Sequence, residues 1–253
     1  MSSLRISTMT GLSELSSNID LDVVFNNLSI NDNIRYIEYG NNTDGSKRYK
    51  GYSKKNLKKV RKVNKRNIFF NQATIHIYLN KVINMKVFNN GKIQMTGLID
   101  EQQIHKVLYI FIKECNTLSE KVFIDNDNPK IIYSDIVLIN SDFDIGFPIN
   151  REILYRYLIR DGYFCTYEPC QYPGINIKYY NNVLNNNGIC NCTEVCDGKG
   201  NSNGNGECKR ITLAIFKSGK IIITGGKELD QVYNAYRFIT DYLIRYKQII
   251  LNK

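Results

Sequence analysis

The sequence has no long hydrophobic run. Its longest uninterrupted apolar stretch is the six residues Val107–Ile112, whereas a membrane-spanning helix needs about 20. The opening residues, MSSLRISTMTG, lack the apolar core of a signal peptide. The sequence therefore predicts no transmembrane helix, and we expect an intracellular protein without a membrane partner.

The sequence also lacks the residue patterns on which most enzyme sites depend. It has no evident Ser/His/Asp set, paired-carboxylate motif or phosphate-cradling glycine loop. The two histidines stand apart, His76 in a strand-like stretch and His105 in a helix-like one. We expect structural or surface roles for both, and we predict that the protein is not an enzyme.

Cysteines number seven, and an odd count without a secretion signal argues against a disulfide framework. Four of them, Cys190, Cys192, Cys196 and Cys208, lie within 19 positions of an Asn/Gly-rich stretch. Such a stretch cannot build its own core, but four thiolates around one structural Zn²⁺ would hold it together. The spacing C-x-C-x3-C-x11-C is not the usual C-x2-C arrangement, so reduced free cysteines and a disulfide pair stay open as alternatives.

Positive charge is abundant. The net charge is +10 and the pI is near 9.1, which favours a polyanionic partner, either nucleic acid or an anionic membrane.

One sequence unit occurs twice. FNNGKIQMTG begins at Phe88 and FKSGKIIITG begins at Phe216, an offset of 128 residues. The same offset aligns Tyr39 with Tyr167, and IDLDVVFNNL at 19–28 with FPINREILYR at 147–156. Three anchors at one offset predict a tandem duplication with halves 1–123 and 130–253, joined by a turn at DNDNP, residues 125–129.

Each half carries the same predicted elements. A β-like run precedes a short helix, which Pro148 would open in the second half. Alternating strands with Asn-Gly or Ser-Gly turns follow, and a long amphipathic helix ends each half. We therefore predict an α+β fold, with the helices on one face of an antiparallel sheet and the halves joined edge to edge with twofold pseudosymmetry.

Alternation assigns the two faces of the predicted sheet. One face is aliphatic and suits packing under helices, with Ile93, Met95, Ile221 and Ile223. The other mixes cations, small polar and aliphatic residues beside Phe88 and Phe216, with Lys92, Gln94, Thr96, Lys220, Ile222 and Thr224. Such a face suits a DNA minor groove, where apolar wedges enter base steps and cations meet phosphate. The alternative is a set of plain amphipathic hairpins with solvated outer faces.

These residues resemble the core domain of the TATA-box-binding protein family over nearly the whole chain, apart from two insertions. The most specific stretches are YEPCQYPGINIKYY at 167–180, ITLAIFKSGKIIITGGK at 211–227, and the first copy FNNGKIQMTG. The resemblance implies a pseudo-twofold saddle, in which a ten-stranded antiparallel sheet binds DNA and four helices lie on the convex face.

The resemblance also implies roles for single residues. Tyr172 and Phe216, with Phe88 and either Phe70 or Phe69, fall at the wedges that enter the end steps of the site. Thr96 and Thr224 fall on base-edge threonines, and Gln94 and Ile222 on residues of the groove floor. Phosphate-facing or basic positions are matched by Lys92, Lys220 and Lys178.

Some positions depart from the family pattern. The family's pair of base-contacting asparagines falls nearest Leu4 and Asp135, and neither replaces that contact. Tyr172 replaces a wedge Phe, and Gln94 replaces a groove-floor Val. The resemblance thus implies an A·T-rich site with an altered sequence preference. The alternative is a protein-interaction module of the transcription machinery that has lost specific DNA binding.

The resemblance extends to partners. Glu168 matches a glutamate through which the family contacts transcription factor IIB, whereas Cys170 stands where the family has a second acid. We expect a transcription-initiation factor that bends double-stranded DNA and binds a transcription factor IIB-like protein and the RNA polymerase machinery. It would act in a nucleus, or in a cytoplasmic viral factory if it is viral.

Two insertions set the chain apart from the family. The first, about residues 40–66, holds eleven Lys or Arg and no acid from Lys47 to Arg66. We favour a phosphate-binding extension, with a solvated loop and a nuclear-localisation signal as alternatives. The second, about residues 181–209, holds the cysteine cluster, for which we expect a role in partner recruitment or in steadying a hairpin. An enzyme that uses this cluster as an active metal site is a remote alternative, because four-thiolate zinc leaves no open coordination position.

Overall fold

The computed structural model describes residues 1–41, 47–53, 70–185 and 187–251. In this part of the chain the backbone forms two compact units. The N-terminal unit is Met9–Ile136, and the C-terminal unit is Met1–Thr8 with Val137–Lys253. The long strands β1 (Arg5–Leu15) and β7 (Ile131–Asp144) contribute residues to both units.

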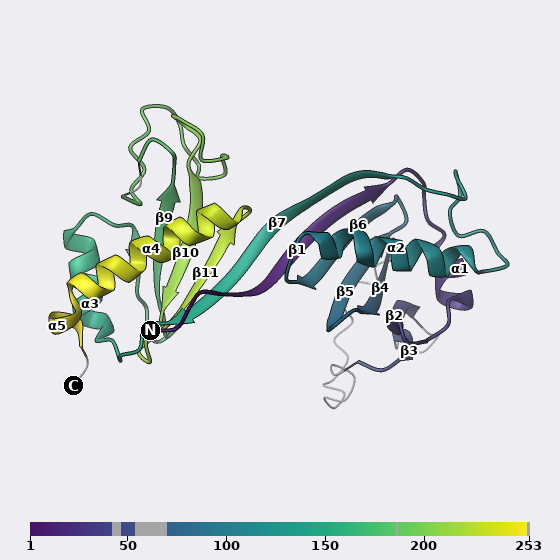
Figure 1. The fold of residues 1–253 in the computed structure, drawn as a ribbon, viewed down its shortest axis with the longest axis horizontal. Helices are drawn as coiled ribbons and strands as arrows, with labels where there is room; N and C mark the ends of the chain where they lie inside the picture. Colours follow the sequence, from purple (N-terminus) through teal and green to yellow (C-terminus); the bar gives the residue numbers. More distant parts are fainter. Residues whose placement is uncertain (42–46, 54–69, 186, 252–253) are drawn as a thin grey trace. The chain divides into compact units, whose positions relative to one another are not determined.

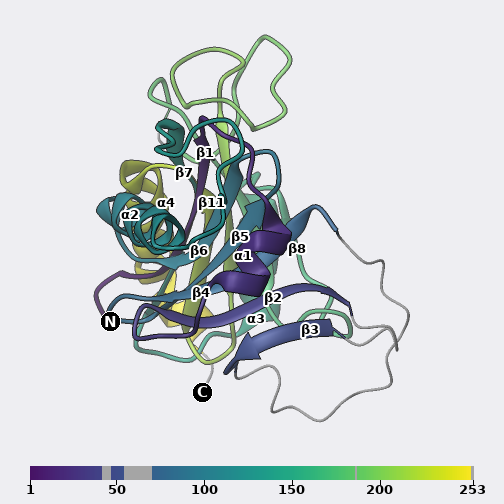
Figure 2. The same cartoon turned by 90° about the vertical axis from the view of Figure 1, so that its right-hand side faces the viewer.

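The N-terminal unit is an antiparallel sheet with two helices. Its strands follow the order β3-β2-β4-β5-β6-β1. Their bounds are β2 Ile34–Asn41, β3 Lys47–Gly51, β4 Gln72–Tyr78, β5 Val82–Phe88 and β6 Lys92–Leu98. The helices are α1 (Leu21–Asn27) and α2 (Gln102–Asn116). Figure 2 shows β3 alongside β2 at one edge of this sheet.

The C-terminal unit repeats this plan. Its strand order is β7-β11-β10-β9-β8, again antiparallel. The strands are β8 Cys165–Thr166, β9 Ile175–Asn181, β10 Lys209–Ile215 and β11 Lys220–Gly226. The helices are α3 Arg151–Arg160, α4 Leu229–Arg245 and α5 Lys247–Ile250. α4 lies across β9, β10 and β11, and the cysteine-containing loop extends beyond β9 and β10 (Figure 1).

The predicted α+β class is confirmed, with two differences in detail. The described residues contain eleven strands and five helices, because the basic insertion supplies β3 and the chain end supplies α5. α3 also begins later than Pro148. Asn150 is its N-cap, and the Asn150 side chain accepts a hydrogen bond from Ile153 N at 3.2 Å. The two repeats, 1–123 and 130–253, stay a prediction.

The aliphatic sheet faces form the cores, as the alternation predicted. Ile93, Met95, Ile221 and Ile223 are at most 1% exposed. They are covered by the buried sides of α2 and α4, which include Val107, Leu108, Phe111, Val232, Ile239 and Leu243. The opposite side of each sheet, the outer face, is covered by no helix of the described residues (Figure 1). No helix in the described residues is long and apolar enough to cross a membrane.

Candidate nucleic-acid interface

The outer face of the C-terminal unit follows from its strand register. On β11, Thr224, Ile222 and Lys220 stand directly across from Asn140, Asp142 and Asp144 of β7. Since directly opposite residues share a face, these six side chains belong to one surface. β10 and β9 continue it with Thr212, Ala214, Lys178 and Asn176. Ile222 is 39% exposed, so an aliphatic side chain lies open among polar ones.

The two wedge residues predicted for the second repeat lie together. The ring centroids of Tyr172 and Phe216 are 5.8 Å apart, and the rings meet edge to face at 61°. Gly174 makes this approach feasible, because a Cβ there would lie 2.8 Å from Tyr172 Cε1. The Arg151 guanidinium donates to the Pro173 carbonyl and packs over the Tyr167 ring, which fixes the turn that carries Tyr172.

Lys178 is a partly buried member of the outer face. Its Nζ donates to Thr212 Oγ1 at 2.9 Å across the β9–β10 pair. Burial lowers the pKa of Lys178, and repulsion from Arg210 lowers it further. The hydrogen bond to Thr212 uses one of the three N–H donors of the ammonium, which leaves two for a phosphate.

The outer face of the N-terminal unit has a corresponding arrangement. Lys92, Gln94 and Thr96 of β6 stand opposite Glu14, Leu12 and Thr10 of β1. Neighbouring β5 adds Asn84 and Lys86, which stand opposite Thr96 and Gln94. The structure thus places Lys92, Gln94 and Thr96 on the outer face of this unit. Their counterparts Lys220, Ile222 and Thr224 lie on the outer face of the C-terminal unit.

The predicted wedges of this unit are less closely joined. Phe88 ends β5 opposite Gln72, and Phe70 lies two residues before Gln72 with 66% of its surface exposed. The Phe70 carbonyl accepts a hydrogen bond from Tyr39 Oη at 3.1 Å. No ring contact joins Phe88 to Phe70 in the described part of the chain, and Phe69 lies outside it.

The outer face of the C-terminal unit carries an asparagine that the sequence comparison with the family did not identify. Leu4 lies ahead of β1, and Asp135 accepts a hydrogen bond from Tyr133 Oη at 3.2 Å. Asn140, in contrast, stands directly across from Thr224, and Thr224 Oγ1 donates to Asn140 Oδ1. Sequence reasoning missed Asn140, because only the pairing of β7 with β11 reveals which β7 residues accompany Thr224.

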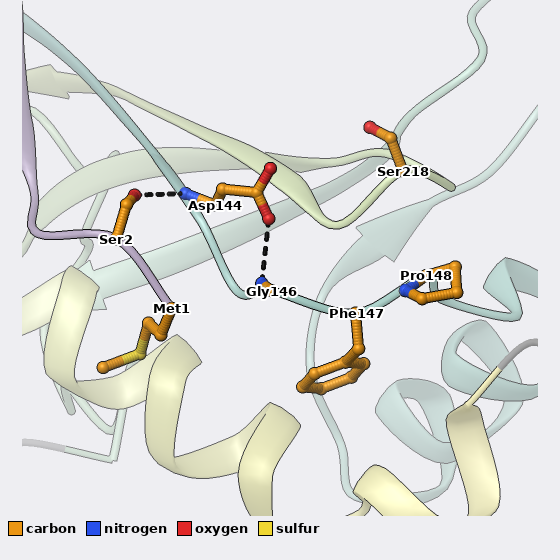
Figure 3. Close-up of a pocket in the computed structure, with 7 residues that line it drawn as sticks. All are labelled: Met1, Ser2, Asp144, Gly146, Phe147, Pro148 and Ser218. Atoms are coloured by element: carbon orange, nitrogen blue, oxygen red, sulfur yellow. Dashed lines mark hydrogen bonds between the residues drawn. The ribbon is translucent and has the colours of Figure 1, made fainter.

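Carboxylates on the inner strands were also missed. Glu14 faces Lys92, and Asp144 faces Lys220, so two of the three predicted phosphate-contacting lysines have an acid directly opposite. Asp144 is held in place, because its Oδ1 accepts a hydrogen bond from Gly146 N at 2.8 Å (Figure 3). These acids reduce the positive potential that each lysine offers to a polyanion.

A surface cavity of about 480 Å³ adjoins Asp144. Its lining is Met1, Ser2, Asp144, Gly146, Phe147, Pro148 and Ser218 (Figure 3). None of the residues predicted to contact DNA lines it. The candidate interface is therefore the open sheet face, and not this cavity.

The described part of the basic insertion forms β3, and its binding to phosphate stays a prediction. Arg48 and Lys50 of β3 lie over the Phe25 ring of α1, at 4.5 and 5.2 Å from its centroid. Burial lowers the pKa of Lys50, as does the charge of Arg48. Lys47 forms an ion pair with Glu38. The remaining predicted cations, Lys54–Arg66, lie outside the described residues.

Glu168 lies in the exposed turn between β8 and β9. Its carbonyl accepts hydrogen bonds from the backbone N–H groups of Gln171 and Tyr172, both at 2.9 Å. Its side chain and that of Cys170 are exposed. A partner can reach Glu168 without any rearrangement of this turn.

The four clustered cysteines converge. The sulfurs of Cys190, Cys192, Cys196 and Cys208 all lie within 4.8 Å of one another. Two of the separations are 3.4 Å (Cys192 to Cys208) and 3.8 Å (Cys190 to Cys208). Four thiolates about 2.3 Å from a tetrahedral Zn²⁺ would lie about 3.8 Å apart. The described geometry therefore fits a four-thiolate metal site.

The surroundings of the cluster also fit a metal. The Gly206 N–H donates to the Cys192 sulfur and lowers its pKa, as a thiolate ligand requires. Asn182 Nδ2 donates to Cys208 Sγ at 3.4 Å. Burial raises the pKa of Cys208 to about 12, so this thiol needs a bound cation to ionise near neutral pH.

A buried polar network fastens the cysteine loop to the rest of its unit. Ser202 is 4% exposed, and its Oγ accepts hydrogen bonds from Asn181 Nδ2 at 2.9 Å and Gln231 Nε2 at 3.5 Å. Asn234 Nδ2 donates to Asn181 Oδ1 at 3.1 Å. The loop thereby contacts both the end of β9 and the first turns of α4.

Comparison with known proteins connects this geometry to one family. The family profile described as "Transcription factor TFIID (or TATA-binding protein, TBP)" matches residues 135–246. The chain is 31% identical over 269 residues to a "TATA-box-binding protein-like" protein of Acanthamoeba polyphaga mimivirus, covering 96% of this chain and 65% of the relative. It is 27% identical over 157 residues to "TATA-box-binding protein E" of Halobacterium salinarum, covering 62% of this chain and 66% of the relative. The alignments thus span slightly less than two thirds of these relatives' length.

The fold of the chain is similar to that of a solved structure. The TBP of Methanococcus jannaschii superposes with a TM-score of 0.52 at 19% identity, covering 96% of this chain and 99% of that one. The profile match and the relative that aligns along most of the chain show that this chain is similar to the TATA-binding protein family, and the solved structure shows the fold of that family.

Proposed function

We propose that the protein is a transcription-initiation factor. It would bind the minor groove of double-stranded DNA with a preference for A·T-rich sites, and bend the duplex. Phe88 in one unit, and Tyr172 with Phe216 in the other, would enter base steps. Thr96, Thr224, Gln94 and Ile222 would face base edges, while Lys92, Lys220 and Lys178 would meet phosphates. Phe70 would accompany Phe88.

One observation carries this proposal. Each unit has a helix-free sheet face on which cations, threonines and aliphatic residues alternate, with exposed aromatic rings where strands end. Such a face offers phosphate contacts at its cations and apolar wedges at its rings, the two requirements of minor-groove bending. Similarity to the TATA-binding protein family favours the same function.

The experiment that tests the proposal is end-to-end fluorescence energy transfer on a doubly labelled A·T-rich duplex, titrated with protein at two salt concentrations. A G·C-rich duplex is the control. We expect the ends of the A·T-rich duplex to approach each other on binding. Equal binding to both duplexes without bending would contradict the proposal. It would favour a protein-interaction module that has lost specific DNA recognition.

The same proposal includes a protein partner. A transcription factor IIB-like protein would bind the exposed turn at Glu168 and connect the complex to RNA polymerase, in a nucleus or in a viral factory. Glu168→Arg should abolish pull-down of such a partner while DNA binding stays unchanged. Loss of both activities would show that the turn supports the fold and not the partner.

We also propose that Cys190, Cys192, Cys196 and Cys208 bind one structural Zn²⁺. The metal would replace the core that the Asn/Gly-rich loop lacks. Metal analysis should find about one zinc per chain, and Cys192→Ser should remove it. A chelator should then loosen the loop, seen as faster amide exchange at residues 182–208, while β9 and β10 stay protected. A metal-free protein with a protected loop would contradict this site.

A further inference from the structure

The outer face of the C-terminal unit carries an ion pair beside the Asn140–Thr224 contact. Arg5 Nη2 lies 2.9 Å from both carboxylate oxygens of Asp142. Asp142 stands directly across from Ile222, and its side chain is 33% exposed, against 73% for Arg5. On a face that binds DNA, this pair would lie next to the residues that read base edges.

A carboxylate on such a face has a narrow choice of partners. In the minor groove an A·T pair presents only acceptors, whereas a G·C pair adds the donor N2–H₂ of guanine. Asp142 is acceptor-only when ionised, so it repels an A·T edge and accepts from a guanine amino group. Arg5 neutralises the charge that would otherwise repel the groove, and its remaining N–H groups can donate to groove acceptors.

The N-terminal unit lacks this carboxylate. There Gln94 takes the place of Ile222 in the strand register, and the residue across from it is Leu12. Leu12 is 36% exposed and has no hydrogen-bonding side chain. The two units therefore offer different groups at corresponding positions of their outer faces.

We propose that Asp142, oriented by Arg5, reads a guanine amino group in the half-site bound by the C-terminal unit. This proposal rests on the proposed minor-groove binding. Because the N-terminal unit has Leu12 at the corresponding position, the guanine would lie in one half of the site only. It would thereby fix the direction in which a pseudo-symmetric protein binds its site.

The test is selection of bound duplexes from an A·T-rich library with randomised central positions, followed by sequencing. We expect the wild-type protein to enrich a G·C pair in one half-site. Asp142→Leu, which copies Leu12, should reduce that preference about tenfold. Arg5→Gln should reduce it as well. Asp144→Asn is the matched comparison, because it removes a carboxylate from the same strand and face without touching the pair. It should raise the affinity for all sequences alike and leave the guanine preference unchanged.

A reciprocal variant makes the test stronger. Leu12→Asp should add a guanine preference to the other half-site, an outcome that a merely misfolded protein cannot produce. Equal guanine preference in wild type and Asp142→Leu, or none in wild type, would overturn the inference. If the wild-type protein selects no sequence and bends no duplex, the proposed function itself fails, and the bending assay distinguishes that outcome.

Discussion

At the residue scale, two of the three lysines proposed to contact phosphate are opposed by acids of their own sheet. Lys92 faces Glu14, and Lys220 faces Asp144. Directly opposite side chains of an antiparallel pair lie about 5 Å apart at Cβ, close enough for the carboxylate to compete with phosphate for the ammonium. Although the net charge of the chain is +10, these acids reduce the positive potential of the sheet face.

Removing either acid should therefore strengthen DNA binding. We expect Glu14→Gln and Asp144→Asn to tighten binding and to steepen its salt dependence, by up to about 0.9 in the log–log slope for each phosphate contact that is freed. Fluorescence anisotropy across a salt series measures both. Asp127→Asn is the control, because Asp127 pairs with Lys121 in a loop. An equal gain in this control would point to net charge alone.

Gly174 is a second residue whose role can be tested. A Cβ at this position would lie 2.8 Å from Tyr172 Cε1 and 3.3 Å from Phe216 Cε1. Gly174→Ala should push the two rings apart at a cost of about 1–3 kcal/mol of overpacking. We expect reduced bending of the A·T-rich duplex, while urea denaturation shows a folded protein. Unchanged bending would mean that the ring pair is not a wedge.

At the element scale, the same hydrogen bond, from a backbone N–H to a glutamine side chain, precedes both long helices. Gln103 Oε1 accepts a hydrogen bond from Ile99 N at 2.9 Å before α2, and Gln231 Oε1 accepts one from Lys227 N at 3.0 Å before α4. Both glutamines are buried, at 6% and 2% exposure. Each satisfies a backbone donor that would otherwise lie unpaired beside the helix N-terminus.

These glutamines form a matched pair for a stability experiment. Gln103→Ala and Gln231→Ala should each destabilise the protein by about 1–3 kcal/mol, because a buried N–H loses its acceptor. Gln231 also donates to Ser202 of the cysteine loop. Gln231→Ala alone should therefore speed amide exchange in that loop. Equal exchange in both variants would show that the loop does not depend on α4.

The sequence predicted strands and buried faces well where the spacing of residues within one segment determines them. β6 and β11 have matching bounds, Lys92–Leu98 and Lys220–Gly226, at the predicted offset of 128, and the buried faces were correct. The four cysteine sulfurs converge, as a shared metal site requires, whereas the spacing alone left free cysteines and a disulfide pair open.

Features that depend on long-range pairing were not predictable in this way. Asn140, Asp142 and Glu14 enter the site only through the register of β7 and β1. The offset of 128 does not hold for these inner strands: Glu14 and Asp144, which oppose the equivalent lysines Lys92 and Lys220, are 130 residues apart. β3 was not predicted, because the basic run was interpreted as a phosphate-binding extension, whereas Arg48 packs on the Phe25 ring.

At the scale of the whole molecule, each unit has its own proposed wedge. Phe88 ends β5 in the N-terminal unit, and Phe216 follows β10 in the C-terminal unit. If each wedge unstacks one base step, the two kinks add to give the full bend. Removing one of the two wedges should then remove only part of the bend. A protein with a single wedge would lose the whole bend.

We therefore expect Phe88→Ala and Phe216→Ala each to reduce the bend of the A·T-rich duplex to about half, and the double variant to abolish it. Energy transfer between the duplex ends, measured at saturating protein, reports the bend separately from affinity. Tyr109→Ala is the control, because Tyr109 is an aromatic residue on α2 with 66% of its surface exposed. If either single variant removes the whole bend, the wedges act together and the two units do not bend DNA independently.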